Sequence, residues 1–362
     1  MIASRIYLKP DSSHIDPPLG VRRQSIRMTI LVTGTAGFIG NHLALRLLSS
    51  GRQVIGLDNL TPYYDVRLKE ARLKRLAEFD GFTDVRMDLE DRPGMQALFE
   101  KYKPNVVVHL AAQAGVRYSI EAPQSYIDSN LVGLGNILEG CRHAKTEHLL
   151  FASSSSVYGI NAKLPFSTDD PVDHPISLYA ATKRAGELMT HTYAHLFNIP
   201  STCLRFFTVY GPWGRPDMAL FLFTDAIRQG KPIKVFNNGN MRRAFTYIDD
   251  IVESIVRLIP CAPTPADSAI GLTPGVSPVA PYRILNLGAS ETVALERYIE
   301  LIEQNLGRKA IKEYMPMQAG DVPATSADVT DLQAVIDWRP TTTVETGVKN
   351  FIAWYKDYYG VN

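Results

Sequence analysis

The sequence predicts an α/β protein built on a doubly wound parallel sheet, followed by a smaller C-terminal α/β domain that binds the substrate. From Met28 onward, short apolar runs rich in β-branched residues alternate with segments of helical periodicity. The turn TGTAGFIG joins the first of these runs to the first helical segment. Strands that alternate with helices in this way indicate a parallel sheet of the Rossmann type, with helices on both faces.

The strands and helices can be assigned in chain order. Buried strands are predicted at Thr29–Thr33, Gln53–Leu57, Val106–Leu110, His148–Ala152 and Thr202–Phe207. After the first strand, Leu43, Leu47 and Leu48 recur at helical spacing, and Gly51 ends that helix. The predicted helices are Phe38–Ser49, Ser125–Arg142, Leu178–Phe197, Leu295–Leu306 and Val344–Tyr355. Six prolines between Ile259 and Pro281 predict a long surface loop.

The 362 residues suffice for about two domains of roughly 150 residues each. Residues 1–27 contain prolines and charges but no apolar stretch of a secretory signal, which predicts a flexible N-terminal extension. Residues 28–207 carry the alternating pattern and are predicted to form the Rossmann domain. Proline, glycine and aromatic residues then become frequent. Residues 208–362 are therefore predicted to form mainly the substrate domain, with some segments crossing back to the first domain.

The composition excludes several classes of protein. The formal net charge is +1, from 38 basic and 37 acidic residues, which argues against a nucleic-acid binder and a polybasic membrane anchor. No apolar run approaches the ~20 residues that cross a bilayer. The three widely spaced cysteines predict a cytoplasmic protein without a disulfide scaffold. The eight histidines show no metal-ligand spacing, so no metal is expected.

The glycine-rich turn predicts a dinucleotide site. Gly34, Gly37 and Gly40 allow a sharp turn and let backbone amides at a helix N-terminus approach a pyrophosphate. The second strand ends in Asp58, whose carboxylate can bind the adenosine ribose hydroxyls and would repel the 2′-phosphate of NADP. NAD is therefore the predicted cofactor. The residues expected to contact it are Gly34, Gly37, Phe38, Ile39, Gly40, Asp58, Asn59, Asp88, Leu89 and Lys183.

A tyrosine and a lysine supply the predicted acid–base chemistry. Tyr179 and Lys183 are four residues apart in LYAATKRAGEL, so they share one helical face. The ammonium and the positive nicotinamide are expected to lower the phenol pKa from about 10, which lets Tyr179 act as a base. The phenolate would take a proton from a substrate hydroxyl while hydride leaves the same carbon. One serine of SSSSVYG is expected to hydrogen-bond the reacting oxygen.

In their order along the chain, these motifs resemble the extended short-chain dehydrogenase/reductase superfamily. Within it, the chain is most similar to the nucleotide-sugar epimerases, and specifically to the UDP-glucuronate 4-epimerases. The resemblance covers about residues 28–350. The segments most specific to the uronate branch are TPYYDVRLKEARL at 61–73 and RFFTVYGPWGRPDMALF at 205–221.

The resemblance implies a role for individual residues. Tyr179 is the base, Lys183 anchors the nicotinamide ribose, and Ser154 is the catalytic hydroxyl. Thr208 and Arg215 are expected near the sugar carboxylate. Arg243 is expected at the nucleotide phosphates, although the family aspartate beside it is Ala244 here. The full set expected to bind substrate is Arg117, Ser154, Ser155, Thr208, Arg215 and Arg243.

The implied reaction is NAD-dependent C4 epimerisation of UDP-glucuronate to UDP-galacturonate. Tyr179 takes the 4′-hydroxyl proton while hydride passes to NAD, the 4-keto sugar rotates, and hydride returns to its other face. The 4-keto sugar is a β-keto acid, so the enzyme must hold its carboxylate to prevent loss of carbon dioxide. A bidentate grip by Arg215 would do this. The resemblance also implies a role in polysaccharide biosynthesis and a homodimer formed through the helices around 125–142 and 178–197.

Several alternatives remain open. A dehydratase or a decarboxylase of this superfamily needs a carboxylate beside the catalytic hydroxyl, where this chain has Ser155 and Ser156. UDP-glucose 4-epimerase is possible, but its substrate has no carboxylate to explain Arg215. A non-catalytic NAD-binding regulator would tend to lose the tyrosine or the lysine, and both are present.

Overall fold

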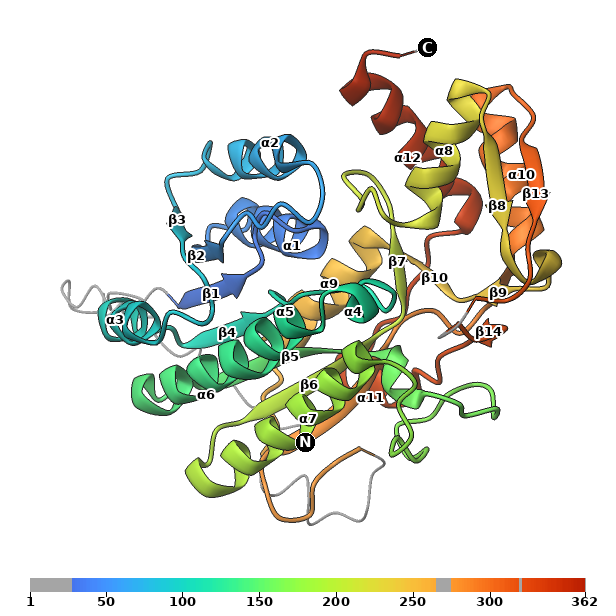
Figure 1. The fold of residues 1–362 in the computed structure, drawn as a ribbon. Helices are drawn as coiled ribbons and strands as arrows, with labels where there is room; N and C mark the ends of the chain where they lie inside the picture. The colour runs from blue at the N-terminus through green and yellow to red at the C-terminus, as the bar shows by residue number, and fades with distance from the viewer. Residues whose placement is uncertain (1–27, 265–274, 319–320, 362) are drawn as a thin grey trace, which may run out of the picture.

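The computed structural model describes residues 28–264, 275–318 and 321–361. At its centre is a seven-stranded sheet in the order β11-β6-β5-β4-β1-β2-β3, in which every pair is parallel (Figure 1). The strands are β1 (Thr29–Thr33), β2 (Gln53–Asp58), β3 (Phe82–Arg86), β4 (Val106–His109), β5 (His148–Ser154), β6 (Ser201–Phe206) and β11 (Tyr282–Leu287). The predicted doubly wound sheet is confirmed. The predicted extension at 1–27 lies outside the described residues, as does the part of the predicted proline-rich loop at 265–274.

Helices cover both faces of the sheet because successive side chains of a strand point to opposite faces. Leu31 of β1 packs in one apolar cluster with Leu98 and Leu138, whereas Ile30 packs in another with Leu43. The first face carries α3 (Arg92–Tyr102), α6 (Gly133–Ala144) and α7 (Leu178–Phe197). The second face carries α1 (Phe38–Ser49), α2 (Val66–Leu76), α9 (Ile248–Leu258) and α11 (Thr330–Ile336). Both faces of each central strand are therefore buried, as an all-parallel sheet requires.

The remaining elements lie mostly beyond residue 208. Figure 1 shows α8, α10 and α12 grouped on one side of the molecule, away from α3 and α6. Short strands form three small sheets beside them, in the orders β10-β7, β12-β9-β14 and β13-β8. The helices are α8 (Ala219–Gln229), α10 (Leu295–Leu306) and α12 (Val344–Tyr359), and the strands are β7 (Thr208–Tyr210), β8 (Pro232–Val235), β9 (Arg242–Arg243), β10 (Phe245–Tyr247), β12 (Val293–Ala294), β13 (Ile311–Tyr314) and β14 (Ala324–Thr325).

The helix predicted at Ser125–Arg142 is not one regular helix. It consists of α5 (Pro123–Ile127), a π-helical turn η1 (Asp128–Val132) and α6. Within η1, the buried amide of Asn130 accepts a hydrogen bond from the backbone N–H of Gln113 and donates one to the Thr182 hydroxyl. A wide turn of this kind brings a side chain out of the ordinary helical repeat, and here it connects the helix to the loop after β4 and to α7.

A buried histidine predicts how stability depends on pH. The His148 ring is 1% exposed and lies between the Ile259 carbonyl and the Thr202 hydroxyl, at 3.1 and 2.9 Å. Burial lowers its pKa to about 4. As the pH falls below the unfolded value of about 6.5, the unfolded chain takes up this proton first, so stability is lost between about pH 6.5 and 4.

His148→Gln removes this titration. We expect the free energy of unfolding of the wild type to fall more steeply with decreasing pH than that of the variant, by at most about 1.4 kcal/mol per pH unit. Urea denaturation at pH 7, 6 and 5 measures both slopes. Parallel profiles would show that His148 does not contribute to acid sensitivity.

Candidate active site

A cavity of about 960 Å³ lies at the carboxyl ends of the central strands. This edge of an open parallel sheet is where ligands usually bind, since the strand order reverses there between β1 and β4. Loops after β1, β2, β4 and β5 line one part of the wall, and residues after 208 line the other. Of the residues predicted to act in the site, the wall contains Gly34, Gly37, Phe38, Ile39, Gly40, Asp58, Asn59, Leu89, Arg117, Ser154, Ser155, Tyr179, Lys183, Thr208, Arg215 and Arg243. Asp88 is exposed and stands outside this wall.

The turn between β1 and α1 forms a cradle for an anion. Gly34 has a φ of +80°, and its N–H donates to the Leu57 carbonyl at 2.7 Å. A β-carbon on Gly40 would overlap the Gly34 carbonyl oxygen, so α1 can begin this close to the turn only with glycine. Within the described residues no side chain caps α1 at Gly37. Its first amides are therefore available to a pyrophosphate.

Asp58 ends β2 beside this cradle and is 7% exposed. Its two carboxylate oxygens accept hydrogen bonds from the backbone N–H groups of Ala36 and Leu60, at 3.0 and 2.8 Å. These bonds fix the carboxylate at the cavity wall, where it can accept from ribose hydroxyls. The Asn59 amide donates to Asp88 at 2.8 Å, so Asp88 supports the wall from outside.

Tyr179 and Lys183 both face the cavity from α7, which the Ser177 hydroxyl caps by accepting from Ala180 N–H. Lys183 Nζ donates to the Ala152 carbonyl at 2.8 Å, and burial lowers its pKa to about 8. Burial raises the pKa of the Tyr179 phenol, while contact with Ser154 and the charge of Arg215 lower it. The predicted lowering of the phenol pKa is not seen in the protein alone: burial is the largest influence on Tyr179, and Lys183 is not among the groups that shift it.

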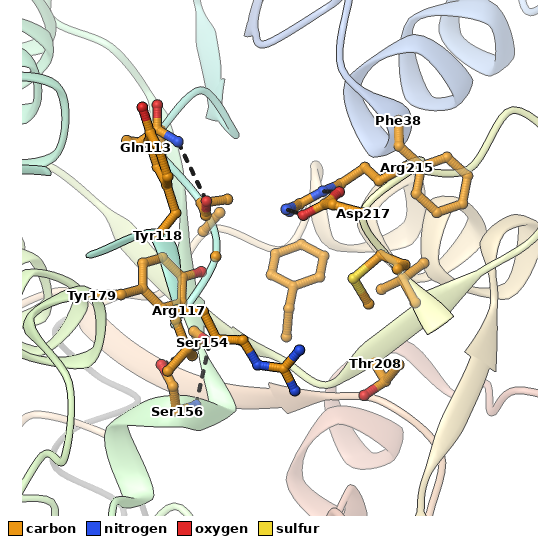
Figure 2. A pocket seen from close by; sticks show the side chains of 18 of the residues that line it. Phe38, Gln113, Arg117, Tyr118, Ser154, Ser156, Tyr179, Thr208, Arg215 and Asp217 are labelled. Carbon is orange, nitrogen blue, oxygen red and sulfur yellow. Dashed lines mark hydrogen bonds and ion pairs between the residues drawn. The ribbon is translucent and has the colours of Figure 1, made fainter. Parts of the chain in front are cut away.

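The serines of SSSSVYG point in different directions and have different hydrogen-bond partners. Ser153 turns away from the cavity centre and donates to Glu187 at 2.6 Å, while Glu187 also pairs with buried Arg205 at 2.9 Å. The Ser154 hydroxyl accepts from the backbone N–H of Ser156 at 3.2 Å and shares a 3.0 Å hydrogen bond with its hydroxyl. Ser154 thus points to the reacting side of the strand end, near Tyr179 (Figure 2).

Arg215 stands on the opposite side of the cavity, together with Asp217 and Thr208 (Figure 2). Arg215 Nε and Nη2 donate to the two oxygens of Asp217 at 3.0 and 2.5 Å, and the Tyr63 hydroxyl donates to Asp217 at 3.1 Å. Burial opposes ionisation of Asp217, but the charge and hydrogen bonds of Arg215 hold its pKa below the ordinary value.

This pairing changes the predicted geometry of the arginine. The side edge of the Arg215 guanidinium is occupied by Asp217, so a second carboxylate can be gripped only through the end of the fork. Both hydrogens of Nη1 and the second hydrogen of Nη2 remain for that contact. Asp217 was not predicted as a functional residue, although the two-residue spacing in Arg-Pro-Asp was a signal for the ion pair.

The two other predicted arginines contact the part of the wall formed after residue 208, although Arg117 itself belongs to the loop after β4. Arg117 pairs with Asp321 at 3.1 Å and lies over the Phe236 ring. Arg243 Nη1 donates to the carbonyls of Arg242 and Pro323, at 3.0 and 3.2 Å. Backbone oxygens thus support Arg243 in this chain, next to a fully buried Ala244.

Comparisons with known proteins agree with this geometry. The family described as NAD dependent epimerase/dehydratase matches residues 30–271. A Rhizobium meliloti (strain 1021) protein named probable UDP-glucuronate 4-epimerase is 50% identical over 334 residues, which cover 92% of this chain and 98% of the relative. UDP-glucuronic acid 4-epimerase from Bacillus cereus, in complex with UDP-glucuronic acid and NAD, has a similar structure. Its TM-score is 0.81 at 32% identity, with coverage of 92% of this chain and 100% of that one.

A second solved structure resembles the chain less in sequence. UDP-glucose 4-epimerase from Thermotoga maritima with UDP-glucose has a TM-score of 0.78 at 26% identity, covering 92% of this chain and 100% of that one. In the part of the chain that the structure describes, there is no cluster of three or more His, Cys, Asp or Glu side chains that could hold a metal ion. None of the described helices is both long and apolar enough to cross a membrane.

Proposed function

Because the chain belongs to the NAD-dependent epimerase/dehydratase family, we propose that it is an isomerase that inverts C4 of UDP-glucuronate to give UDP-galacturonate. The observation that carries this proposal is the arrangement of one cavity. Tyr179, Ser154 and Lys183 stand on one side, and a fixed cation, Arg215, stands with Thr208 on the other. A general base and an arginine that can bind a carboxylate thus stand on opposite sides of one cavity of about 960 Å³. Relatives named as UDP-glucuronate 4-epimerases support the assignment.

NAD is the cofactor of this family, as the sequence predicted, and the residues present fit it. The uncapped start of α1 at Gly37 suits the pyrophosphate, and the fixed carboxylate of Asp58 suits the ribose hydroxyls. We assign Lys183 to the nicotinamide ribose. When bound, NAD supplies reversible hydride transfer at C4′ of the sugar.

The chain's own residues handle the proton and the reacting oxygen. Tyr179 removes the proton of the 4′-hydroxyl, and Ser154 hydrogen-bonds the same oxygen. Because burial raises the pKa of the phenol in the protein alone, the positive charges that surround it in the loaded site must favour its ionised form. Arg215 already acts on the phenol in this direction, and Lys183 lines the same cavity from the helix of Tyr179.

Arg215 and Thr208 hold the sugar carboxylate. The 4-keto sugar is a β-keto acid, which loses carbon dioxide when the breaking bond aligns with the carbonyl π-system. An arginine whose side edge is fixed by Asp217 has a defined plane, so it can hold the carboxylate out of that alignment. At the catalytic hydroxyl, Ser155 and Ser156 offer no carboxylate for a dehydratase or decarboxylase reaction.

One incubation tests the proposal. We expect the purified protein to convert UDP-glucuronate to UDP-galacturonate without added cofactor, because NAD is regenerated in each turnover. Acid denaturation should then release NAD and not NADP, since Asp58 would repel a 2′-phosphate. Separation of the sugar nucleotides and assay of the released dinucleotide measure both results. Conversion of UDP-glucose alone, a UDP-pentose as the main product, or release of NADP alone would contradict the proposal.

We further propose how the molecule is organised in the cell. Residues 28–207 serve mainly the cofactor and residues 208–362 mainly the sugar nucleotide, with α9 and β11 returning to the central sheet. Large apolar side chains exposed near α6 and on α7, such as Val132, Leu188 and Leu196, support a homodimer through these helices. We place the reaction in the cytoplasm, where its three free cysteines remain reduced, as a step toward polysaccharide biosynthesis.

A further inference from the structure

Arg72 is a buried cation that the reaction does not use directly. It lies on α2, is fully buried, and uses all of its N–H groups within the protein. Nη1 donates to the Ala36 carbonyl at 2.9 Å and to the Tyr64 hydroxyl at 2.6 Å. Nε and Nη2 donate to the Trp213 carbonyl at 3.2 and 2.6 Å, and Nη2 also reaches the Gly214 carbonyl at 3.1 Å.

These acceptors belong to the two halves of the active site. Ala36 lies in the glycine-rich turn that cradles the pyrophosphate, and Trp213 and Gly214 directly precede Arg215. The planar side chain of Arg72 therefore connects the glycine-rich turn with the loop that carries Arg215.

The loop needs this support, because its backbone is strained. Trp213 has a φ of +59°, which is unfavourable for a side chain of this size. The carbonyl just before it, that of Pro212, interacts with His42 of α1 at 3.0 Å. Three successive carbonyls before Arg215 are thus held by side chains of α1 and α2, and Arg72 holds two of them.

The charge of Arg72 has no carboxylate within ion-pair distance among the described residues. Burial lowers the pKa of its guanidinium, although an arginine stays charged in proteins. A buried cation that contacts only neutral oxygens is costly for folding. Asp58, at the same glycine turn, is a negative charge that acts on Arg72 from beyond ion-pair distance. An anion bound at the turn would add a second one, because interactions in the interior are weakly screened.

We propose that Arg72 is a positioning residue that couples the two ligands: its charge strengthens NAD binding through the glycine turn, and its fork sets the orientation of Arg215 toward the sugar carboxylate. This rests on the proposed function for the identity of the sugar. Charge and geometry can be separated experimentally, since lysine keeps the charge of arginine but not its planar fork.

The test compares Arg72→Lys and Arg72→Met with Lys74→Met, which removes an exposed positive charge from the same helix. We expect Arg72→Met to bind NAD roughly tenfold more weakly in a fluorescence titration of the cofactor-free protein, and Arg72→Lys to recover most of this affinity. Both variants should lose roughly tenfold or more in the ratio of kcat/KM for UDP-glucuronate over UDP-glucose, because misplacement of a binding group by about 1 Å is enough for such a loss. The Lys74 variant should match the wild type.

A third readout is independent of the substrate. Hydrogen–deuterium exchange at residues 211–217 should be faster in Arg72→Lys than in the wild type, and unchanged in Lys74→Met. Wild-type exchange in this segment together with an unchanged selectivity ratio would overturn the inference, as would equal losses on both sugars. If Arg72→Met does not fold, Arg72→Lys decides the question alone. A wild type inactive on UDP-glucuronate would contradict the proposed function. The NAD affinity and the hydrogen–deuterium exchange of the Arg72 variants would still test the role of Arg72.

Discussion

Tyr179→Phe should lower kcat for UDP-glucuronate by roughly 10²–10⁴-fold, the usual contribution of a general base. The variant keeps the ring that lines the cavity beside Tyr126 and loses only the ionisable oxygen. Substrate affinity should therefore change little, and the loss should appear in kcat and not in KM. Steady-state kinetics, with isothermal titration of the sugar nucleotide to the variant, measures the two effects separately.

A matched control lies on the same helix. The Tyr193 hydroxyl donates to Glu139 at 2.6 Å and is remote from the cavity wall. Tyr193→Phe removes a phenolic oxygen from α7 without touching the site, so its kcat should stay close to that of the wild type. Near-normal turnover in Tyr179→Phe would mean that another group removes the 4′ proton, and the assignment of Tyr179 would be wrong.

Arg215→Ala should lower kcat/KM for UDP-glucuronate by roughly ten- to a hundredfold, since a charge-assisted contact contributes about 1.5–3 kcal/mol. UDP-glucose has no carboxylate and should be affected much less. Arg215→Lys should recover only part of the activity, because an ammonium lacks the planar fork. Thr208→Val should act in the same direction but more weakly, as a neutral hydroxyl contributes about 0.5–1.5 kcal/mol.

The ion pair with Asp217 requires a further control. Removing Arg215 alone leaves the Asp217 carboxylate on the cavity wall without its cation, and this negative charge would by itself repel an acidic substrate. The double variant Arg215→Ala/Asp217→Ala removes both charges. If lost grip is the cause, the double variant should stay as poor on UDP-glucuronate as the single one, and a UDP-pentose by-product should form in both. Equal losses on the two sugar nucleotides would show that Arg215 serves the fold or the diphosphate.

Much of the fold followed from local patterns. The helices at Leu178–Phe197 and Leu295–Leu306 lie where their periodicity predicted, because each buries one apolar face and begins and ends within its own segment. Strand β11 was not predicted. It follows a long proline-rich stretch, and only its pairing with β6 makes it the edge of the central sheet. The π-helical turn at Asp128–Val132 was missed because the helical spacing of apolar residues continues through it.

The candidate site likewise has parts that the sequence could predict and parts that it could not. The place of the glycine turn, Asp58, Tyr179 and Lys183 at one cavity could be predicted, because each motif has a fixed spacing along one segment. Asp217 was missed as the partner of Arg215, and no spacing along the chain connects Arg72 with Trp213, which are brought together only by folding. Nor did the sequence indicate that desolvation would be the largest influence on the pKa of Tyr179, because burial depends on every surrounding element.

The bonds from His42 and Arg72 to the segment before Arg215 also bear on how such enzymes diversify. Substrate preference in this molecule depends on residues of both halves of the chain. A chimera that joined residues 208–362 to the nucleotide-binding half of another protein would inherit Arg215 but lose the side chains that hold its loop. The segments 61–73 and 205–221 are therefore expected to be exchanged together or not at all, since Arg72 in the first segment holds the backbone of the second.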